Sequence, residues 1–243
     1  MKGVVLAGGL GTRLRPLTLI TNKHLLPVYN RPMISYPIET LRLAGITEIM
    51  IVCGREHVGH FINYLGSGKE SGVKLSYAVQ DKNNGGIADA LSYAEDFADQ
   101  GDIAVILGDN IFEDSFLNPI KSFVGGAQIF IKKVKDPERY GVPVFDVTGK
   151  KIIKIEEKPK KPKSNYAQTG LYLLDNQIFS FINKLEPSKR GEMEITDAIN
   201  QYVRAGKINF SIVKGPWHDA GTIQSLLEAS VEISKGFSKG NLK

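Results

Sequence analysis

Residues 1–18 read MKGVVLAGGLGTRLRPLT, in which the apolar run GVVLA leads into three glycines and two arginines, Arg13 and Arg15. An apolar run before a glycine-rich turn predicts a buried strand. Glycine lets backbone amides approach a ligand closely, and the planar guanidinium of arginine suits phosphate. The stretch therefore predicts a loop that binds a phosphorylated ligand at the end of a strand.

Two familiar phosphate-binding loops do not fit this stretch. A dinucleotide fingerprint requires a third glycine at position 14, which is Leu14. A Walker loop that starts at Gly8 requires glycine, lysine and a hydroxyl residue at positions 13 to 15, which are Arg13, Leu14 and Arg15. We therefore expect a phosphate loop of a third kind, and a nicotinamide-dependent dehydrogenase is disfavoured.

The first 125 residues alternate short apolar runs with helix-like segments. Amphipathic spacing predicts helices over 33–45, 57–65 and 87–98. This alternation predicts an α/β fold with a doubly wound, largely parallel sheet. Ligands of such sheets bind beyond the carboxyl ends of the strands. The polar strand ends AGGLGTR, VQDKNNGG and LGDN are therefore expected to converge on one crevice. The four apolar runs lie at 3–7, 47–53, 74–80 and 102–110.

After about residue 125 the pattern becomes richer in strands, which predicts a mixed or antiparallel region. The lysine-rich stretch KPKKPKS, with Lys160, Lys161 and Lys163, is typical of an exposed loop whose charges are solvated. The expected strands lie at 127–134, 141–147, 151–159, 166–174 and 208–215, and the expected helices at 176–185, 195–206 and 222–233.

Composition limits the class of protein. The 243 residues suffice for one large domain, or for one domain with a smaller lid. A net charge of +5 is compatible with anionic small substrates but too weak to predict nucleic-acid binding. The single cysteine, Cys53, ends an apolar run and is expected in the core, without a disulfide. Without an evident signal peptide or membrane-spanning run, the chain is expected to be cytoplasmic, with no membrane partner.

Two aspartates are candidate metal ligands. Asp109 follows the apolar run VIL, where a strand would deliver a carboxylate into the crevice, although a turn or N-cap aspartate is an equally good interpretation. Asp219 lies in GPWHDAG. A nucleotide-bound magnesium ion needs only one or two protein carboxylates, because phosphates and water supply its other ligands. His218 lacks the spaced His/Cys partners of a transition-metal site, so Mg²⁺ is favoured.

Lysine and arginine candidates are less specific. Lys23, in TLITNKHLLPV, fits either a snorkelling side chain or a phosphate ligand beside the glycine loop. Glu157 and Lys158 are adjacent in EEKP, and Arg190 lies in RGEMEITD. Neighbouring surface charges of this kind are usually solvated. A functional role for these three residues rests on resemblance alone.

That resemblance is extensive. GVVLAGGLGTRLRPLT followed by NKHLLPVYNRPMI resembles the signature of the sugar-1-phosphate nucleotidylyltransferases. GDN, DPERYGV, EEKPKKPKSNYAQTGLY, RGEMEITD and WHDAG then follow in the order found in glucose-1-phosphate thymidylyltransferases. The similarity runs from about residue 2 to residue 230. The opening motif is specific to the superfamily, whereas SNYAQTGLY and RGEMEITD together are specific to the thymidylyltransferase branch.

The resemblance implies a fold and an activity. The fold would be a Rossmann-like three-layer sandwich with a mostly parallel mixed central sheet and a small sugar-binding β-rich region. It would form a single domain over 1–243, with a nucleotide-binding part over about 1–125 and a sugar-phosphate-binding part over about 126–235. The activity would transfer a nucleotidyl group from dTTP to glucose 1-phosphate, for activated-sugar synthesis of the dTDP-rhamnose type. A UTP-dependent enzyme, or one that uses another sugar 1-phosphate, is the alternative. A homo-oligomer, dimer or tetramer, would be in keeping with longer relatives.

The resemblance also implies site residues. Arg13, Lys23 and Asp109 would be catalytic, and Asp109 with Asp219 would hold Mg²⁺. The nucleotide would be bound by Leu6, Gly8, Gly9, Gly11, Thr12, Arg13, Gln80 and Gly86, of which Gln80 and Gly86 would contact the base. The sugar phosphate would be bound by Asn110, Gly141, Glu157, Lys158, Gly170 and Arg190.

The sequence departs from the family pattern in several places. VQDKNNGGIADA is about one residue longer than usual and rich in asparagine, which affects the placing of Gly85 and Gly86. Pro143 and Val144 stand where a glutamate is frequent, Gln168 replaces a typical valine, and the loop before Trp217 is short. The chain ends soon after residue 233, without the helical C-terminal extension of longer members. The extension's contribution to a regulatory product site is left open.

The implied mechanism needs no general base, because the attacking phosphate oxygen is already ionised. This agrees with the absence of an evident Ser/His or Cys/His arrangement. Two polyanions must be brought together, so catalysis is expected to come from positioning and charge neutralisation. A nucleotide-sugar-dependent glycosyltransferase and a non-catalytic nucleotide-sugar sensor are the rival hypotheses. The glycosyltransferase would not require the GGLGTR loop together with Lys23. The presence of Arg13, Asp109 and Asp219 argues against the sensor.

Overall fold

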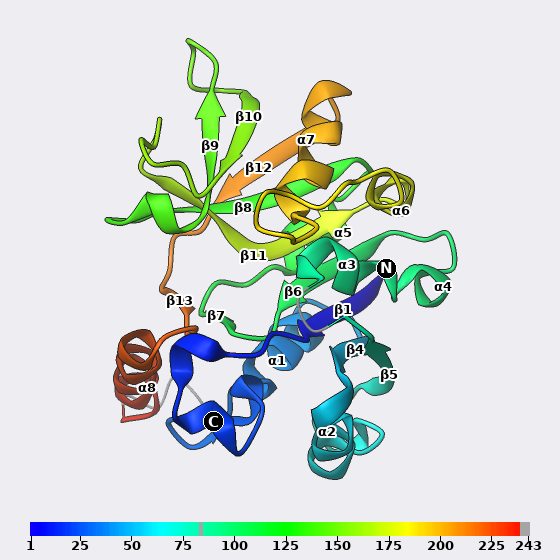
Figure 1. The fold of residues 1–243 in the computed structure, drawn as a ribbon, viewed down its shortest axis with the longest axis vertical. Helices are drawn as coiled ribbons and strands as arrows, with labels where there is room; N and C mark the ends of the chain where they lie inside the picture. The colour runs from blue at the N-terminus through cyan, green and yellow to red at the C-terminus, as the bar shows by residue number, and fades with distance from the viewer. Residues whose placement is uncertain (83–84, 239–243) are drawn as a thin grey trace.

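A seven-stranded sheet forms the centre of the protein (Figure 1). The structure, a computed structural model, describes residues 1–82 and 85–238. The strand order is β12-β8-β11-β6-β1-β4-β5, and every neighbouring pair is parallel except those of β11, which is antiparallel to β6 and to β8. The strands are β1 (Lys2–Ala7), β4 (Glu48–Gly54), β5 (Lys74–Gln80), β6 (Ile103–Leu107), β8 (Ala127–Lys133), β11 (Tyr166–Leu174) and β12 (Ile208–Ile212).

Helices cover both faces of this sheet. Along β1, Val4 and Leu6 belong to one buried cluster, whereas Val5 and Ala7 belong to the other. A strand buried on both faces reads as a continuous apolar run, which is why GVVLA shows no polar alternation. The predicted three-layer sandwich with a mostly parallel mixed sheet is confirmed. The helices on the face of Val4 are α3 (Gly86–Ser92), α4 (Glu95–Ala98), α6 (Gln177–Ile182) and α7 (Ile195–Arg204), and those on the face of Val5 are α1 (Ser35–Leu43), α2 (Val58–Leu65) and α5 (Leu117–Lys121).

The predicted helices are present, with one change. The segment 87–98, predicted as one helix, forms α3 and α4 instead. Between them the amide of Ala94 bonds to the carbonyl of Leu91, three residues back, and the tighter turn ends α3. Cys53 is fully buried in the core, as predicted. None of the helices in the described ranges is long and apolar enough to cross a lipid bilayer.

The strands after residue 125 show the predicted mixed pairing, and three of them belong to the central sheet. β8, β11 and β12 complete the central sheet, and β11 lies between β8 and β6. Pairing between segments this distant in sequence cannot be inferred from local periodicity. β9 (Gly141–Phe145) and β10 (Ile152–Glu157) form a separate antiparallel hairpin, which stands above the sheet in Figure 1.

A third small core lies beside the carboxyl edge of the sheet. It joins Leu14 and Leu26 of the N-terminal loops to Leu226 and Ala229 of α8 (Ile223–Ser238). The short strands β7 (Asn110–Phe112) and β13 (Trp217–Asp219) pair antiparallel between α8 and the sheet, and β2 (Pro27–Val28) pairs with β3 (Arg31–Pro32). This core anchors the segments that carry the site.

Candidate active site

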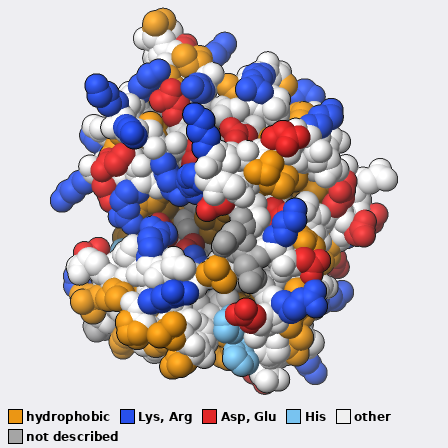
Figure 2. All heavy atoms as spheres, viewed as in Figure 1, with side chains coloured by type: hydrophobic (Ala, Val, Ile, Leu, Met, Phe, Trp, Pro, Cys, Tyr) orange, Lys and Arg blue, Asp and Glu red, His pale blue; other side chains and the backbone are white. Residues whose placement is uncertain are grey.

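A cavity of about 660 Å³ opens where the carboxyl ends of β1, β5 and β6 meet, as predicted. Figure 2 shows the molecule hollowed near its middle, with lysine and arginine side chains gathered around the hollow. A cavity of this size can hold a nucleotide. Arg15 lies outside it. The lining includes every residue that the sequence proposed for the site: Leu6, Gly8, Gly9, Gly11, Thr12, Arg13, Lys23, Gln80, Gly86, Asp109, Asn110, Gly141, Glu157, Lys158, Gly170, Arg190 and Asp219.

The glycines of the loop make room for side chains as well as for ligand. Gly11 has a φ of +62°, and a Cβ there would lie 2.9 Å from the Cβ of Lys23. A Cβ on Gly8 would lie 2.2 Å from Oε1 of Gln80. The loop therefore closes over Lys23 on one side and against the Gln80 amide on the other. A side chain at Gly11 would be strained and would meet Lys23, and one at Gly8 would displace the Gln80 amide.

Lys23 and Asp109 form a buried ion pair, with Nζ 2.5 Å from Oδ2. Asn22 caps the short helix Lys23–Leu25 by accepting a hydrogen bond from the His24 amide, which fixes the start of this segment. Burial by itself would raise the pKa of Asp109. The Lys23 ammonium, together with hydrogen bonds from Lys23 and Asn110, outweighs burial and holds that pKa well below its usual range. Asp109 is therefore a carboxylate at neutral pH.

Asp219 and Arg13 approach Asp109 from other segments. The β7–β13 pairing sets Asp219 opposite Asn110, and the Ala220 amide bonds to the Asp109 carbonyl. A Cβ on Gly221 would lie 3.0 Å from Nη2 of Arg13, 3.0 Å from Oδ1 of Asp219 and 3.6 Å from Oδ2 of Asp109. The three charged groups thus surround one point, which Gly221 leaves open.

The two carboxylates repel each other. Burial, and next the negative charge of Asp109, raise the pKa of Asp219 from 3.8 to about 6. Two carboxylates facing a common point are an oxygen donor set suited to a hard divalent cation. Among the described residues no group of three or more His, Cys, Asp or Glu side chains could hold a metal ion. Two carboxylates are enough for a divalent metal ion whose other ligands come from phosphate and water.

Asn110 is held between the two halves of the cavity. Its Nδ2 donates to Asp109 Oδ1 at 3.0 Å, and its Oδ1 accepts from the Gly170 amide at 2.9 Å and from Trp217 Nε1 at 2.7 Å. A Cβ on Gly170 would lie 2.7 Å from the Asn110 amide, which explains the glycine. Asn110 orients the Asp109 carboxylate and joins it to β11.

Charged side chains line the other half of the cavity. Glu157, at the end of β10, accepts from Thr196 Oγ1 at 2.6 Å and lies 3.6 Å from Arg190 and 3.7 Å from Lys158. Arg190 also pairs with Glu192 at 2.5 Å. Lys158 has a φ of +43°, a strained conformation for a residue with a side chain. Lys158 lines the cavity at this strained position.

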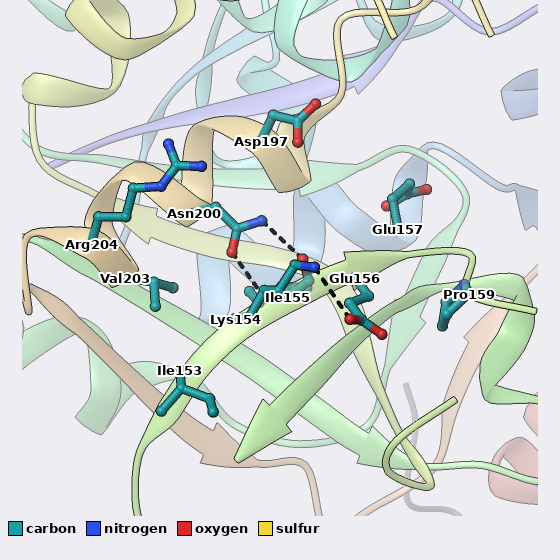
Figure 3. Close-up of a pocket in the computed structure, with 10 residues that line it drawn as sticks. All are labelled: Ile153, Lys154, Ile155, Glu156, Glu157, Pro159, Asp197, Asn200, Val203 and Arg204. Atoms are coloured by element: carbon teal, nitrogen blue, oxygen red, sulfur yellow. Dashed lines mark hydrogen bonds and ion pairs between the residues drawn. The ribbon is translucent and has the colours of Figure 1, made fainter. Parts of the chain in front are cut away.

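A second hollow of about 590 Å³ lies between β10 and α7 (Figure 3). There Asn200 donates to the Ile155 carbonyl at 2.8 Å and accepts from the Ile155 amide at 2.9 Å, as a neighbouring strand would. This contact fixes β10 on α7 and so determines where Glu157 enters the main cavity.

Sequence reasoning missed several lining residues. Arg139 and Tyr140 precede Gly141, and Tyr140 packs against Trp217 with ring centroids 5.3 Å apart. His24 lies beneath Gly108 and is fully buried, and burial lowers its pKa to about 3. The motif DPERYGV already contained Arg139 and Tyr140 beside Gly141. The motifs NKHLLPV and WHDAG contain His24 and Gly221, but the roles of these two residues depend on side chains from distant segments.

Known proteins share this chain's sequence and fold. A family model described as nucleotidyl transferase matches residues 2–236. The glucose-1-phosphate thymidylyltransferase of Neisseria gonorrhoeae is 45% identical over 236 residues, covering 95% of this chain and 81% of the relative. That of Mycolicibacterium smegmatis is 41% identical over 250 residues, covering 99% of this chain and 86% of the relative.

Solved structures agree with these relatives. A Bacillus anthracis protein assigned as a glucose-1-phosphate thymidylyltransferase, in complex with sucrose, has a TM-score of 0.90 and 50% identity and covers 96% of this chain and 94% of its own. UDP-glucose pyrophosphorylase complexed with UDP-glucose has a TM-score of 0.85 and 28% identity, covering 96% of this chain and 98% of its own. On sequence and fold together, the chain belongs to the nucleotidyl transferase family and, within it, to the group of glucose-1-phosphate thymidylyltransferases.

Proposed function

We propose that this nucleotidyltransferase transfers a thymidylyl group from dTTP to glucose 1-phosphate, forming dTDP-glucose and pyrophosphate, with UTP as the alternative donor. The observation that carries the proposal is the convergence of Arg13, Asp109 and Asp219 around the open point at Gly221. A cation held by the two carboxylates would lie between the phosphate-binding loop and the half of the cavity that contains Lys158 and Arg190. This position suits a triphosphate in one half that faces a sugar phosphate in the other.

The nucleotide would occupy the half of the cavity lined by the glycine loop. Gly9, Gly11 and Thr12 line it where the triphosphate would lie, next to Arg13. Leu6, Gln80 and Gly86 form the end that would receive the base. The Gln80 amide is buried at 4% exposure, so a base that contacts it would be recognised away from bulk water.

Asp109 and Asp219 would hold the magnesium ion. The ion would neutralise triphosphate oxygens and help to orient the α-phosphoryl group. Lys23 pairs with Asp109 at 2.5 Å, so its ammonium would lie beside the transferred phosphate. Lys23 also keeps Asp109 ionised, ready to accept a cation.

The sugar phosphate would occupy the other half. Lys158 and Arg190 would bind its phosphate, and each already pairs with a carboxylate that the phosphate can replace. Glu157 would accept hydrogen bonds from sugar hydroxyls, beside Gly141 and Gly170. The β9–β10 hairpin would thereby carry the sugar-binding wall.

The chemical step would be an in-line displacement. A bond forms between the sugar-phosphate oxygen and the α-phosphorus while the bond between the α-phosphorus and the pyrophosphate oxygen breaks. The electron pair of the broken bond leaves with the pyrophosphate oxygen. The nucleophile is an anion, so no proton has to be removed. Arg13 and Lys23 would stabilise the charge that develops on the α-phosphoryl oxygens.

Pyrophosphate release tests this function. We expect magnesium-dependent release with glucose 1-phosphate and dTTP or UTP, and formation of the matching nucleotide-glucose. Release of nucleoside diphosphate from a nucleotide sugar would support the glycosyltransferase, and tight binding without turnover would support the sensor. The likeness to UDP-glucose pyrophosphorylase is the observation that keeps UTP as the alternative. Homo-oligomer formation and a cytoplasmic location remain predictions.

A further inference from the structure

We propose that Asp89, which the motifs did not single out, determines base selectivity by fixing the orientation of the Gln80 amide. This inference rests on the proposed function, in which a pyrimidine triphosphate occupies the glycine-loop half of the cavity. It makes Asp89 a positioning residue that acts through Gln80.

Asp89 and Gln80 are a buried pair. Gln80 ends β5 and is 4% exposed, and Asp89 lies on α3 and is 7% exposed. Nε2 of Gln80 donates to Oδ2 of Asp89 at 2.7 Å and lies 3.4 Å from the Gly86 carbonyl. Both acceptors therefore lie on the nitrogen side of the amide.

Two glycines make this pairing possible. A Cβ on Gly85 would lie 2.0 Å from Oδ2 of Asp89, so a side chain there would displace the carboxylate. A Cβ on Gly8 would lie 2.2 Å from Oε1 of Gln80. The Gln80 amide is thus confined between the carboxylate on its nitrogen side and the glycine loop on its oxygen side, and it lines the cavity between them.

The chemistry of the pair permits one orientation. An ionised carboxylate only accepts hydrogen bonds, so it requires the NH₂ group of Gln80. Rotating the amide by 180° would place Oε1 against Oδ2, two acceptors in contact at a buried site. Asp89 therefore keeps Oε1, an acceptor, directed to the glycine-loop side of the cavity.

An acceptor at this place distinguishes pyrimidines. Thymine and uracil carry an N3–H donor that can satisfy Oε1. Cytosine presents an unprotonated N3 there, which would leave two acceptors facing each other. A site built around a buried hydrogen bond rejects a base that cannot make it. Asp89 would thereby favour dTTP and UTP over CTP, without contacting the base itself.

The test compares kcat/KM for dTTP, UTP and CTP, with glucose 1-phosphate and magnesium, in the wild type and in Asp89→Asn. Asparagine has nearly the same shape but can donate or accept, so Gln80 gains its second orientation. We expect the ratio of CTP to dTTP activity to rise by about 10-fold or more, from the cost of an unpaired buried polar group. Asp96→Asn, an exposed aspartate on the neighbouring helix α4, is the matched control and should leave the ratio unchanged.

Two further variants separate positioning from a merely structural role. Gly85→Ala keeps the carboxylate but places a methyl group where it lies, and it should shift the ratio in the same direction. In a Gln80→Ala background, Asp89→Asn should no longer change the ratio, because the residue through which it acts is gone. Circular dichroism confirms that each variant is folded, and Gly85→Ala decides the question if Asp89→Asn does not fold.

An equal loss with all three nucleotides and an unchanged ratio would overturn this inference and leave the proposed function intact. A persistent effect of Asp89→Asn in the Gln80→Ala background would overturn it as well. A wild type that turns over no pyrimidine triphosphate would overturn both proposals.

Discussion

Asp219→Asn is expected to stabilise the ligand-free protein while strongly lowering its turnover. In the folded chain the pKa of Asp219 is raised from 3.8 to about 6, by burial and by the neighbouring Asp109. The folded state therefore binds a proton more tightly than the unfolded chain. Stability from this group is fully present below pH 3.8 and is lost as the pH rises through 6. At pH 8 the charged side chain destabilises the fold, and an asparagine would not.

The raised pKa gives the size of the effect. A difference of about two pH units corresponds to roughly 3 kcal/mol at 1.36 kcal/mol per unit. Asp219 is only partly buried, and asparagine still has to be desolvated, so we expect about 1–3 kcal/mol. For a domain of this size that gain raises Tm by about 3–10 °C. Turnover should fall by about 100-fold or more, because one of two metal-binding carboxylates is lost.

Thermal unfolding between pH 4 and pH 8, without ligand, measures the stability effect. The variant's advantage should be greatest at pH 8 and vanish near pH 4. Glu70→Gln, an exposed carboxylate outside the cavity, is the control and should show no such trend. A variant that is less stable at pH 8, or an advantage that is independent of pH, would refute the electrostatic argument. Magnesium-dependent turnover at the wild-type rate would refute the metal assignment.

Three other outcomes are expected. Lys158 has a φ of +43°, where a side chain costs about 1–2 kcal/mol, so Lys158→Gly should raise Tm. Because the substitution removes a ligand of the sugar phosphate, it should also raise the KM for glucose 1-phosphate. An unchanged KM in steady-state assays would contradict that role. Burial lowers the pKa of His24 from 6.5 to about 3, so below pH 6.5 only the unfolded chain binds this proton. The contribution of His24 to the free energy of unfolding should therefore fall by up to about 1.4 kcal/mol per pH unit below pH 6.5. Urea titrations of His24→Gln should show a shallower decline, and an identical decline would count against a neutral buried imidazole. Gly221→Ala places a methyl carbon 3.0 Å from Arg13 Nη2 and Asp219 Oδ1. We therefore expect kcat to fall by about tenfold or more, with little change in Tm. An unaffected kcat would show that the reacting groups do not meet at this point.

The local sequence pattern was sufficient to predict the strands and helices and the phosphate-binding character of the first loop. The run GVVLA and the helix spacing over 195–206 depend on residues close in sequence, so their periodicity already reports burial. The charged residues that follow the strands can also be identified from the local sequence. Motif resemblance then placed residues such as Arg190 and Gly170 in the site, and both line the cavity.

Tertiary structure alone decided which of these groups meet. β11 inserts between β6 and β8, so strands from the second half of the chain complete the central sheet. The loop interpreted as a phosphate cradle also gives room to the Gln80 amide, whose orientation Asp89 determines from a helix. The spacing of apolar residues along one strand or helix shows which side chains share a face, because that depends only on the local backbone geometry. Hydrogen bonds, ion pairs and excluded volume join residues far apart in the chain, and their free energies exist only once the sheet has brought those residues together.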